Sequence, residues 1–454
     1  MDNKIARTVM QLLFVIMCVV PALAEALPEI QTWQSPKGAK VLFVQSKTLP
    51  MVDIRIVFDA GSARDGETSG LATLTNALLV EGAGGLTAQE LAERFESVGS
   101  EYINDSMRDM AFVGVRSLVE KKYLDVAVTT LATVLNQPDF NQKEFDRELS
   151  RMKVAVQSRQ QSPSDIADET FYKAVYKDHP YASPPGGTAE SLKKLTVVDV
   201  SAFHKQYYVS SNATVVVVGA LDRKQAEKLV NSLMESLPVG ERANALPEVP
   251  QLSQEQIIYV PYPSTQSHIL VGLPGMQRGD EDYFTLYVAN HSFGGSGFAS
   301  RLVESIREER GLAYSVYSYF LPMREAGPFI MGMQTKADQT QEAIGLLKSE
   351  LRQYIAEGPD EKELTDSISS ITGRFPLNLD SNKELSGYLA MIGFYNLPED
   401  YLHKFIANIE GVKKKDIVQV LKRRIDADKM VTVVVGADAA AADIGVSVND
   451  VGGE

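Results

Sequence analysis

An arginine and a tyrosine in the second half of the chain are the residues best suited to chemistry. Arg310 and Tyr314 are the two ends of the run Arg-Gly-Leu-Ala-Tyr. A guanidinium and a phenol both donate hydrogen bonds, and preorganised donors stabilise negative charge that develops on a reacting oxygen. A tyrosine can also pack in a core, and an arginine can pair with a nearby glutamate. The run alone leaves a catalytic role and a structural role open.

A glycine-rich turn precedes this run. Residues 294–302 read Gly-Gly-Ser-Gly-Phe-Ala-Ser-Arg-Leu and lead into a predicted helix through Ile306 to Glu309. Such a turn can cradle a phosphate, but neither a strand–GxGxxG–helix unit nor a P-loop lysine accompanies it. We therefore interpret the turn as a flexible connection.

The histidines and the single cysteine form no recognisable metal or nucleophile motif. No two of the five histidines are close in the sequence, where they occupy positions 179, 204, 268, 291 and 403. Cys18 lies in the N-terminal apolar run, so a chain cleaved after that run has no thiolate ligand and no cysteine nucleophile. Neither a D-x-D-x-D-G calcium loop nor a G-x-S-x-G elbow is present. We predict no metal site in this chain.

The N-terminus has the pattern of an export signal. Lys4 and Arg7 supply positive charge, residues 10–20 are almost unbroken apolar sequence, and Ala-Leu-Ala at 22–24 is typical of a cleavage site. The apolar run is shorter than the roughly 20 residues of a membrane span. We expect a cleaved signal peptide, with a retained anchor as the alternative, and no later membrane span. A cysteine-free exported chain suits a bacterial periplasm.

Composition and charge exclude several classes of protein. The chain has 454 residues, of which 44% are hydrophobic and 23% charged, as expected for a globular protein of two or three domains. Its formal net charge of −14 makes nucleic acid and anionic membrane surfaces poor partners.

Two pairs of landmarks recur at nearly the same offset. Residues 212–220 and 430–437 each contain a valine run that ends in Gly-Ala, and the two glycines lie 217 residues apart. Residues 53–62 and 267–275 each end in a glycine turn, and these glycines lie 214 residues apart. The shared offset predicts a duplicated domain of roughly 200 residues, each with a sheet and helices packed on it.

A stretch rich in proline and polar residues separates the two halves. Helical apolar periodicity occurs on both sides of it, at Ala88–Val98, Lys122–Leu135, Gln142–Arg159, Thr340–Ala356 and Glu361–Ile371. We therefore predict a signal peptide at 1–24, an N-terminal domain at 27–236, a linker at 237–254, a C-terminal domain at 255–440 and a tail at 441–454.

The second half resembles a known family of enzymes. Residues 300–316 follow the pattern SRL-x-x-x-IRE-x-RGLAYSV, which closely resembles the second domain of pitrilysin/insulinase-type zinc peptidases. In that family the arginine and tyrosine of an R-x-x-x-Y element reach toward the catalytic domain and hold the substrate backbone and the developing oxyanion. The resemblance assigns this supporting role to Arg310 and Tyr314.

The first half resembles the same family but lacks its zinc ligands. Residues 61–72 match the strand-turn-helix entry to the inverted zinc motif H-x-x-E-H, whose histidines bind zinc and whose glutamate polarises water. Here Thr73 replaces the first histidine, Asn76 replaces the glutamate and Ala77 replaces the second histidine. The family's third ligand, seven positions after the glutamate of an Arg-Glu pair, falls on Ala155. Alanine has no donor atom, and an asparagine amide is no base.

The resemblance implies a fold and a division of labour. The fold is α+β, with two homologous α/β-sandwich domains of mixed or antiparallel sheets facing each other across a cleft as half of a peptidase clamshell. Some two-chain members place zinc in one subunit and the Arg/Tyr pair in the other. We expect this chain to be the non-zinc subunit, inactive alone and paired with a homologous zinc-bearing subunit for peptide hydrolysis. The alternative is a periplasmic peptide-binding or scaffold protein without catalysis. His179 lies in a turn like the family's His-Pro turn and is interpreted as a structural or surface residue.

Overall fold

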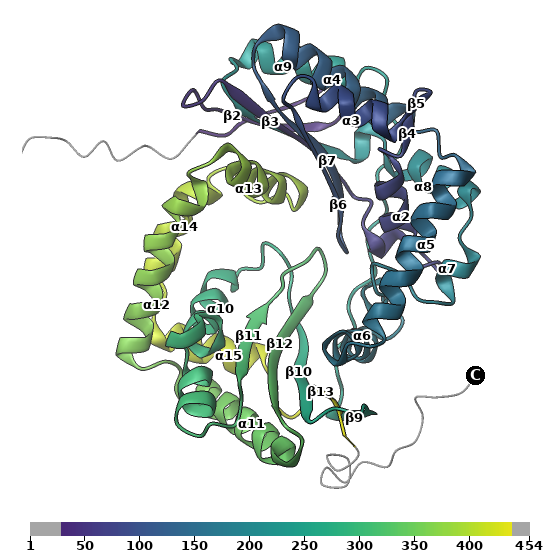
Figure 1. Cartoon of the computed structure of the whole chain (residues 1–454). Helices are drawn as coiled ribbons and strands as arrows, with labels where there is room; N and C mark the ends of the chain where they lie inside the picture. The colour runs from purple at the N-terminus through teal and green to yellow at the C-terminus, as the bar shows by residue number, and fades with distance from the viewer. Residues whose placement is uncertain (1–28, 438–454) are drawn as a thin grey trace, which may run out of the picture.

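Two β-sheets, one in each half of the chain, organise the structure (Figure 1). The computed structural model describes residues 29–437. The predicted signal peptide, Cys18 and the predicted tail at 441–454 lie outside the described residues. In the described part, no helix is long and apolar enough to cross a membrane.

The N-terminal sheet has six strands in the order β1-β2-β8-β3-β7-β6. β8 runs parallel to β2 and antiparallel to β3, and the remaining neighbours are antiparallel. The strands are β1 Gln31–Gln34, β2 Lys40–Gln45, β3 Met51–Phe58, β6 Glu101–Ser106, β7 Ala111–Leu118 and β8 Ala213–Gly219. A separate hairpin pairs β4 Gly82–Ala83 with β5 Leu86–Thr87.

The C-terminal sheet repeats this topology. Its order is β11-β12-β10-β13-β9, in which β13 is parallel to β9 and antiparallel to β10. Its strands are β9 Gln256–Pro261, β10 Gln266–Met276, β11 Ser315–Phe320, β12 Gly327–Lys336 and β13 Val431–Gly436. Strands β2-β8-β3-β7-β6 thus correspond one by one to β9-β13-β10-β12-β11. The predicted duplication and fold class are confirmed.

The five helices predicted from the sequence, α3, α4, α5, α11 and α12, lie close to their predicted positions. Those of the N-terminal half are α2 Leu71–Leu78, α3 Ala88–Glu96, α4 Lys121–Asn136, α5 Gln142–Arg159, α6 Pro163–Tyr176, α7 Ser191–Lys194, α8 Val197–Tyr207 and α9 Arg223–Met234. Those of the C-terminal half are α10 Tyr283–Asn290, α11 Thr340–Glu357, α12 Glu361–Arg374, α13 Asn382–Phe394, α14 Tyr401–Glu410 and α15 Lys414–Arg424. Capping boxes begin α3, α8, α9 and α12, because an N-cap side chain and the third helical residue there satisfy each other's backbone N–H groups.

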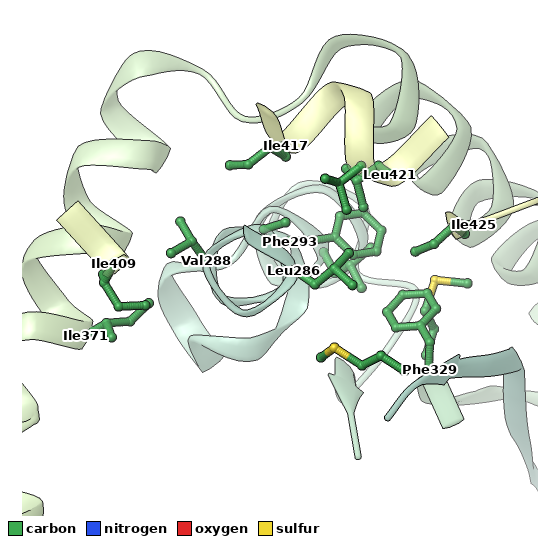
Figure 2. Packing of buried hydrophobic residues seen from close by; sticks show 14 of the residues in the cluster. Leu286, Val288, Phe293, Phe329, Ile371, Ile409, Ile417, Leu421 and Ile425 are labelled. Carbon is green, nitrogen blue, oxygen red and sulfur yellow. The ribbon is translucent and has the colours of Figure 1, made fainter. Parts of the chain in front are cut away.

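The valine runs are central strands that are buried on both faces. In β8, Val215 and Val217 pack with the N-terminal domain's own helices, while Val216 and Val218 face the opposite side. Because neither face meets water, the strand has no polar alternation. β13 has the same character. Helices α10, α11, α12, α14 and α15 contribute to the core on one side of it, and Figure 2 shows part of this packing.

One helix from each domain crosses to the sheet of the other. α13 of the C-terminal half lies across β8 and β3 of the N-terminal sheet. α6 of the N-terminal half lies across β13 and β10 of the C-terminal sheet. Figure 1 shows both helices on the inner faces of the two sheets. Each domain therefore completes the core of the other.

The α13 crossing is close enough to require a glycine. An ideal Cβ at Gly393 would lie 2.5 Å from Thr214 Cγ2 and 2.6 Å from Leu42 Cδ1. These separations are below any normal carbon–carbon contact. A side chain at this position would push α13 away from the N-terminal sheet.

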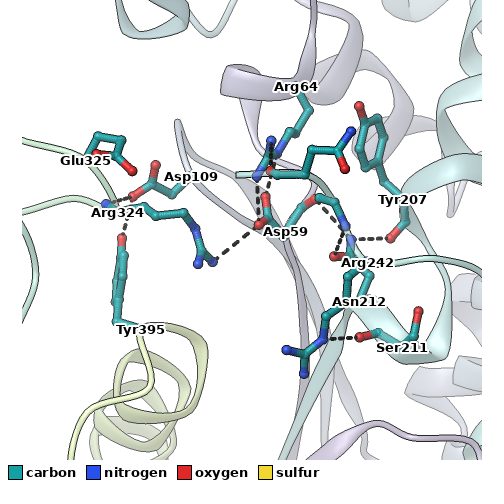
Figure 3. Close-up of polar contacts among 12 residues, drawn as sticks. Asp59, Arg64, Asp109, Tyr207, Ser211, Asn212, Arg242, Arg324, Glu325 and Tyr395 are labelled. Atoms are coloured by element: carbon teal, nitrogen blue, oxygen red, sulfur yellow. Dashed lines mark hydrogen bonds and ion pairs between the residues drawn. The ribbon is translucent and has the colours of Figure 1, made fainter. Parts of the chain in front are cut away.

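Asp109 joins the two domains at the same junction (Figure 3). This buried carboxylate accepts hydrogen bonds from the hydroxyl of Tyr181 at 2.5 Å and from the hydroxyl of Tyr395 at 2.9 Å. It also accepts one from the backbone N–H of Arg324 at 2.6 Å. Tyr181 lies in the N-terminal half, whereas Tyr395 and Arg324 come from the C-terminal half. Asp109 thus fixes the β11–β12 connection and the end of α13 to the N-terminal domain.

A second carboxylate extends this contact to the linker. Asp59 pairs with Arg64 at 2.7 Å and with Arg324 at 3.4 Å (Figure 3). Arg64 also donates to the carbonyl of Asn244, and Arg242 donates to the carbonyl of Ser211. The predicted linker 237–254 contains no helix or strand, as expected for a linker, and is bound along the N-terminal domain.

We predict that Gly393→Ala lowers the free energy of unfolding by roughly 1–3 kcal/mol, because the new methyl group overlaps Thr214 and Leu42. Urea denaturation measures the change. Gly345→Ala in α11 is the matched control, since nothing lies within 4 Å of its Cβ position. It should raise stability by roughly 0.5–1 kcal/mol through helix propensity. Equal changes in the free energy of unfolding for the two variants would contradict the close packing of α13 on the N-terminal sheet.

We predict that Asp109→Ala lowers the free energy of unfolding by roughly 3 kcal/mol or more, because it leaves three buried donors without an acceptor. The same denaturation experiment measures it. Asp105→Ala, on the exposed side of β6, should change stability by no more than about 0.5 kcal/mol. A similar loss of stability in both variants would contradict the role of Asp109 as the buried acceptor that joins the two domains.

Candidate functional site

The helix that carries the degenerate zinc motif is positioned by a buried aspartate. Asp65 accepts hydrogen bonds from the backbone N–H groups of Gly70 and Ala72, each at 2.7 Å, at the start of α2. Gly70 adopts a left-handed conformation with φ of 98°, which favours glycine. Burial raises the pKa of Asp65 to about 7, although these N–H groups oppose the shift. The turn before α2, whose sequence resembles the entry of the inverted motif, is therefore held by Asp65.

The four ligand and base positions lie on two helices that pack together. Thr73, Asn76 and Ala77 lie on α2, and Ala155 lies on α5, which contacts α2 (Figure 1). The Thr73 hydroxyl donates to the carbonyl of Pro185 at 2.8 Å. The position of the first histidine thus anchors the loop after η2 (Pro180–Ala182). Ala77 is half-buried and Ala155 is exposed.

Asn76, at the position of the catalytic glutamate, is enclosed in a hydrogen-bond network. Its amide nitrogen donates to the carbonyl of Phe112 and to the hydroxyl of Tyr208, each at 3.2 Å. Its amide oxygen accepts from the side chain of Asn104 at 2.8 Å. The side chain is buried, and every part of its amide is engaged. An amide held in this way cannot take a proton from water, so Asn76 is a structural residue.

A half-buried histidine lies directly behind this network. The ring of His204 stacks on Tyr208 with 5.0 Å between centroids, and its Nε2 lies 3.0 Å from the carbonyl of Leu135. Since a carbonyl only accepts, Nε2 carries the proton. Burial lowers the pKa of His204 to about 4, so the ring is neutral near pH 7.

The other histidines do not assemble into a metal site. His179 accepts from the backbone N–H of Tyr181 through Nδ1 and contacts the carbonyl of Pro247 through Nε2 at 2.9 Å. It is buried and has the predicted structural role. His291 lies 3.0 Å from the hydroxyl of Ser367. Within residues 29–437, no group of three or more His, Cys, Asp or Glu side chains could hold a metal ion. The residues present at the degenerate motif do not fit zinc.

Arg310 and Tyr314 project from an anchored loop of the C-terminal domain. The loop follows the π-helix η6 (Val303–Glu308) and precedes β11. Leu312 is buried, and its carbonyl accepts from the Thr335 hydroxyl at 2.6 Å. By contrast, Tyr314 is 80% exposed and Arg310 is exposed. The structural alternative, in which Tyr314 packs in a core, is not observed, and the loop presents both side chains to solvent.

Two neighbours of this pair were not singled out from the sequence. Phe298, in the glycine-rich turn, is 79% exposed. The guanidinium of Arg307 lies 4.9 Å from the Phe298 ring and 5.8 Å from the Tyr314 ring. The sequence feature that could have identified these neighbours is an aromatic residue in the glycine-rich turn just before the Arg/Tyr run. Phe298, Arg307 and Tyr314 thus lie together on the surface, and Arg307 also pairs with Glu308 at 3.5 Å.

We predict that acid destabilises the protein through His204. Its lowered pKa means that the unfolded chain binds a proton between about pH 6.5 and pH 4 while the folded chain does not, so stability falls as pH falls through this range. The loss at pH 4.5 is roughly 2.5 kcal/mol. His204→Gln, which keeps a donor for Leu135, should lack this component in urea denaturation at pH 7.5 and 4.5. His403→Gln, at an exposed position, should retain it. Identical pH profiles for all three proteins would contradict the assignment.

Comparison with known proteins places both halves in one family. The family model "Insulinase (Peptidase family M16)" matches residues 40–189, and the model "Peptidase M16 inactive domain" matches residues 194–371. The crystal structure of a peptidase M16 inactive domain from Pseudomonas fluorescens aligns with a TM-score of 0.87 and 34% identity, covering 90% of this chain and 98% of that one. A protease structure from Helicobacter pylori aligns with a TM-score of 0.82 and 21% identity, covering 90% and 100%.

Curated relatives agree with this placement. The Helicobacter pylori "Non-peptidase homolog YmxG" is 26% identical over 413 residues, which are 89% of this chain and 94% of the relative. The Bacillus subtilis "Uncharacterized zinc protease YmxG" is 25% identical over 359 residues, which are 79% and 86%. The chain belongs to the M16, or insulinase, family of peptidases.

Proposed function

We propose that this chain is the non-zinc subunit of an exported, heterodimeric M16 peptidase. A homologous partner with an intact H-x-x-E-H motif supplies the zinc and the water-activating glutamate. Arg310 and Tyr314 of this chain hold the carbonyl oxygen of a peptide substrate as negative charge develops on it. The chain has no activity of its own in this proposal.

The proposal rests on the contrast between the degenerate motif on α2 and the R-x-x-x-Y element of the C-terminal domain. At the degenerate motif, Thr73 and Asn76 are engaged in structural hydrogen bonds and no side chain offers a metal ligand. At the R-x-x-x-Y element, the loop backbone is anchored while Arg310 and Tyr314 are exposed. An exposed donor pair on a fixed loop suits a site that a second chain completes.

The signal-like pattern at the N-terminus supports an exported location for the chain. We propose that residues 1–24 are a signal peptide that is removed on export, and that the mature chain acts in a bacterial periplasm. The partner then carries a signal of the same kind, because both subunits must meet after export.

A second candidate function is a peptide-binding or scaffold role without catalysis. The engaged Asn76 and the relative that carries the name "Non-peptidase homolog" favour it. It shares the prediction of an inactive isolated chain. It differs in assigning no catalytic importance to Tyr314.

The test begins with a pull-down of the tagged protein from its native periplasm and identification of co-purifying chains by mass spectrometry. We expect a stoichiometric partner with an H-x-x-E-H motif. Peptide hydrolysis is then assayed with each chain alone and with the pair. In the pair, Arg310→Ala and Tyr314→Phe should each lower kcat/KM by roughly 100-fold without weakening the complex.

Matched controls are available elsewhere on the surface. Arg94→Ala in α3 and Tyr123→Phe in α4 should leave kcat/KM unchanged. Recovery of the chain alone, or full activity of the zinc-bearing partner without it, would sink the split-site proposal. A stable complex whose activity is indifferent to Tyr314 would favour the scaffold role.

A further inference from the structure

An apolar cavity lies between the two domains, and neither Arg310 nor Tyr314 lines it. Its volume is about 400 Å³, within the range of small-molecule sites. Its walls come from β3, the β6–β7 turn, the β11–β12 connection and α13. Four methionines line it, namely Met107, Met110, Met323 and Met391. Methionine side chains are flexible and adapt to ligands of varied shape.

Three arginines line the same cavity, of which Arg108 donates to the carbonyl of Ser183 at 2.7 Å, whereas Arg55 and Arg278 have no such partner in the described part of the chain. In residues 29–437, no side-chain hydrogen bond or ion pair joins Arg55 or Arg278 to another group, and their Nε atoms are buried and unsatisfied. Arg55 rests on the Phe112 ring at 4.6 Å, and Arg278 lies 5.7 Å from the Tyr395 ring. Buried donors without acceptors are rare in folded proteins and call for an explanation.

The nearby carboxylates either are bound to other donors or attract the arginines of the cavity without a hydrogen bond. Asp109 faces the cavity, but three donors occupy it. Asp53 is paired with Arg116 at 3.0 Å, and it attracts Arg55, as Glu384 does, without forming a hydrogen bond to it. The cavity therefore has a net excess of positive donors within apolar walls.

Apolar side chains also mark the mouth of the cavity. Met107, from the N-terminal domain, is 48% exposed, and Leu321, from the C-terminal domain, is 41% exposed. Both line the cavity, so it is reached past two apolar side chains from opposite domains.

We propose that this interdomain cavity binds an aliphatic carboxylate such as a fatty acid. The chain packs among the four methionines, and the carboxylate accepts hydrogen bonds from Arg55 and Arg278. Guanidinium groups bind carboxylates through paired, charge-assisted hydrogen bonds, which are stronger inside a protein than in water. An acyl chain brings no internal polar groups. A peptide would bring amides, for which the apolar walls offer few partners.

Isothermal titration calorimetry with decanoate on the purified full chain tests the proposal. We expect one site per chain and binding roughly tenfold or more tighter than that of decyltrimethylammonium, which has the same chain length and the opposite charge. Both probes are used below their micellar concentrations. In a third arm, the apolar dipeptide leucyl-leucine, which also ends in a carboxylate, should bind more weakly than decanoate.

Variants and labels locate the site. Arg55→Gln and Arg278→Gln should each weaken decanoate binding by roughly tenfold or more, whereas Arg94→Gln, on the exposed face of α3, should not. With ¹³C-methyl methionine, NMR shifts on adding decanoate should concentrate at Met107, Met110, Met323 and Met391. Thermal unfolding of each variant establishes that it is folded.

Three outcomes would overturn the proposal. These are equal binding of decanoate and decyltrimethylammonium, tighter binding of the dipeptide, and shifts confined to other methionines. The proposal is independent of the split peptidase site, because Arg310 and Tyr314 do not line this cavity. Tyr314→Phe should therefore bind decanoate normally, so failure of either proposal can be told from failure of the other.

Discussion

The exchange of one helix between the two domains is the constraint on which the rest of the structure depends. α13 covers the inner face of the N-terminal sheet, and α6 covers that of the C-terminal sheet. Both sheets have central valine strands without a polar face, so separating the domains would expose apolar surface on both. Asp109, desolvated at the same junction, adds directional bonds that select one arrangement of the domains. The exposed Arg/Tyr loop is thus held in a fixed position relative to α2.

The local elements and the duplication can be predicted from the sequence because they are encoded in patterns along the chain. α5 is predicted at both of its ends, and β8 and β13 are recognisable as buried strands from their valine runs. The helix exchange cannot be predicted in this way. The apolar face of α6 or α13 shows that each helix is buried, but not which sheet covers it. Gly393 is an ordinary helix glycine until Leu42 and Thr214 are placed against it.

In the candidate site, too, some features can be predicted from the sequence and others depend on tertiary contacts. The absence of zinc ligands at Thr73, Asn76, Ala77 and Ala155 is predicted from the sequence, because the resemblance to the family motif assigns a role to each position. What replaces the ligands is not visible, since Asn76 meets Phe112 and Tyr208, which lie 36 and 132 residues away in the chain. The exposure of Arg310 and Tyr314 also depends on how buried Leu312 anchors the loop between them.

The degenerate motif is therefore more than a zinc site with missing ligands. A glutamate at position 76 could not donate to the carbonyl of Phe112, and a histidine at position 73 would release the loop held through Pro185. Positions 73 and 76 therefore hold neighbouring parts of the N-terminal domain together through hydrogen bonds. Tyr314 is the opposite case, because a side chain that is 80% exposed adds little to a core, so folding does not require it.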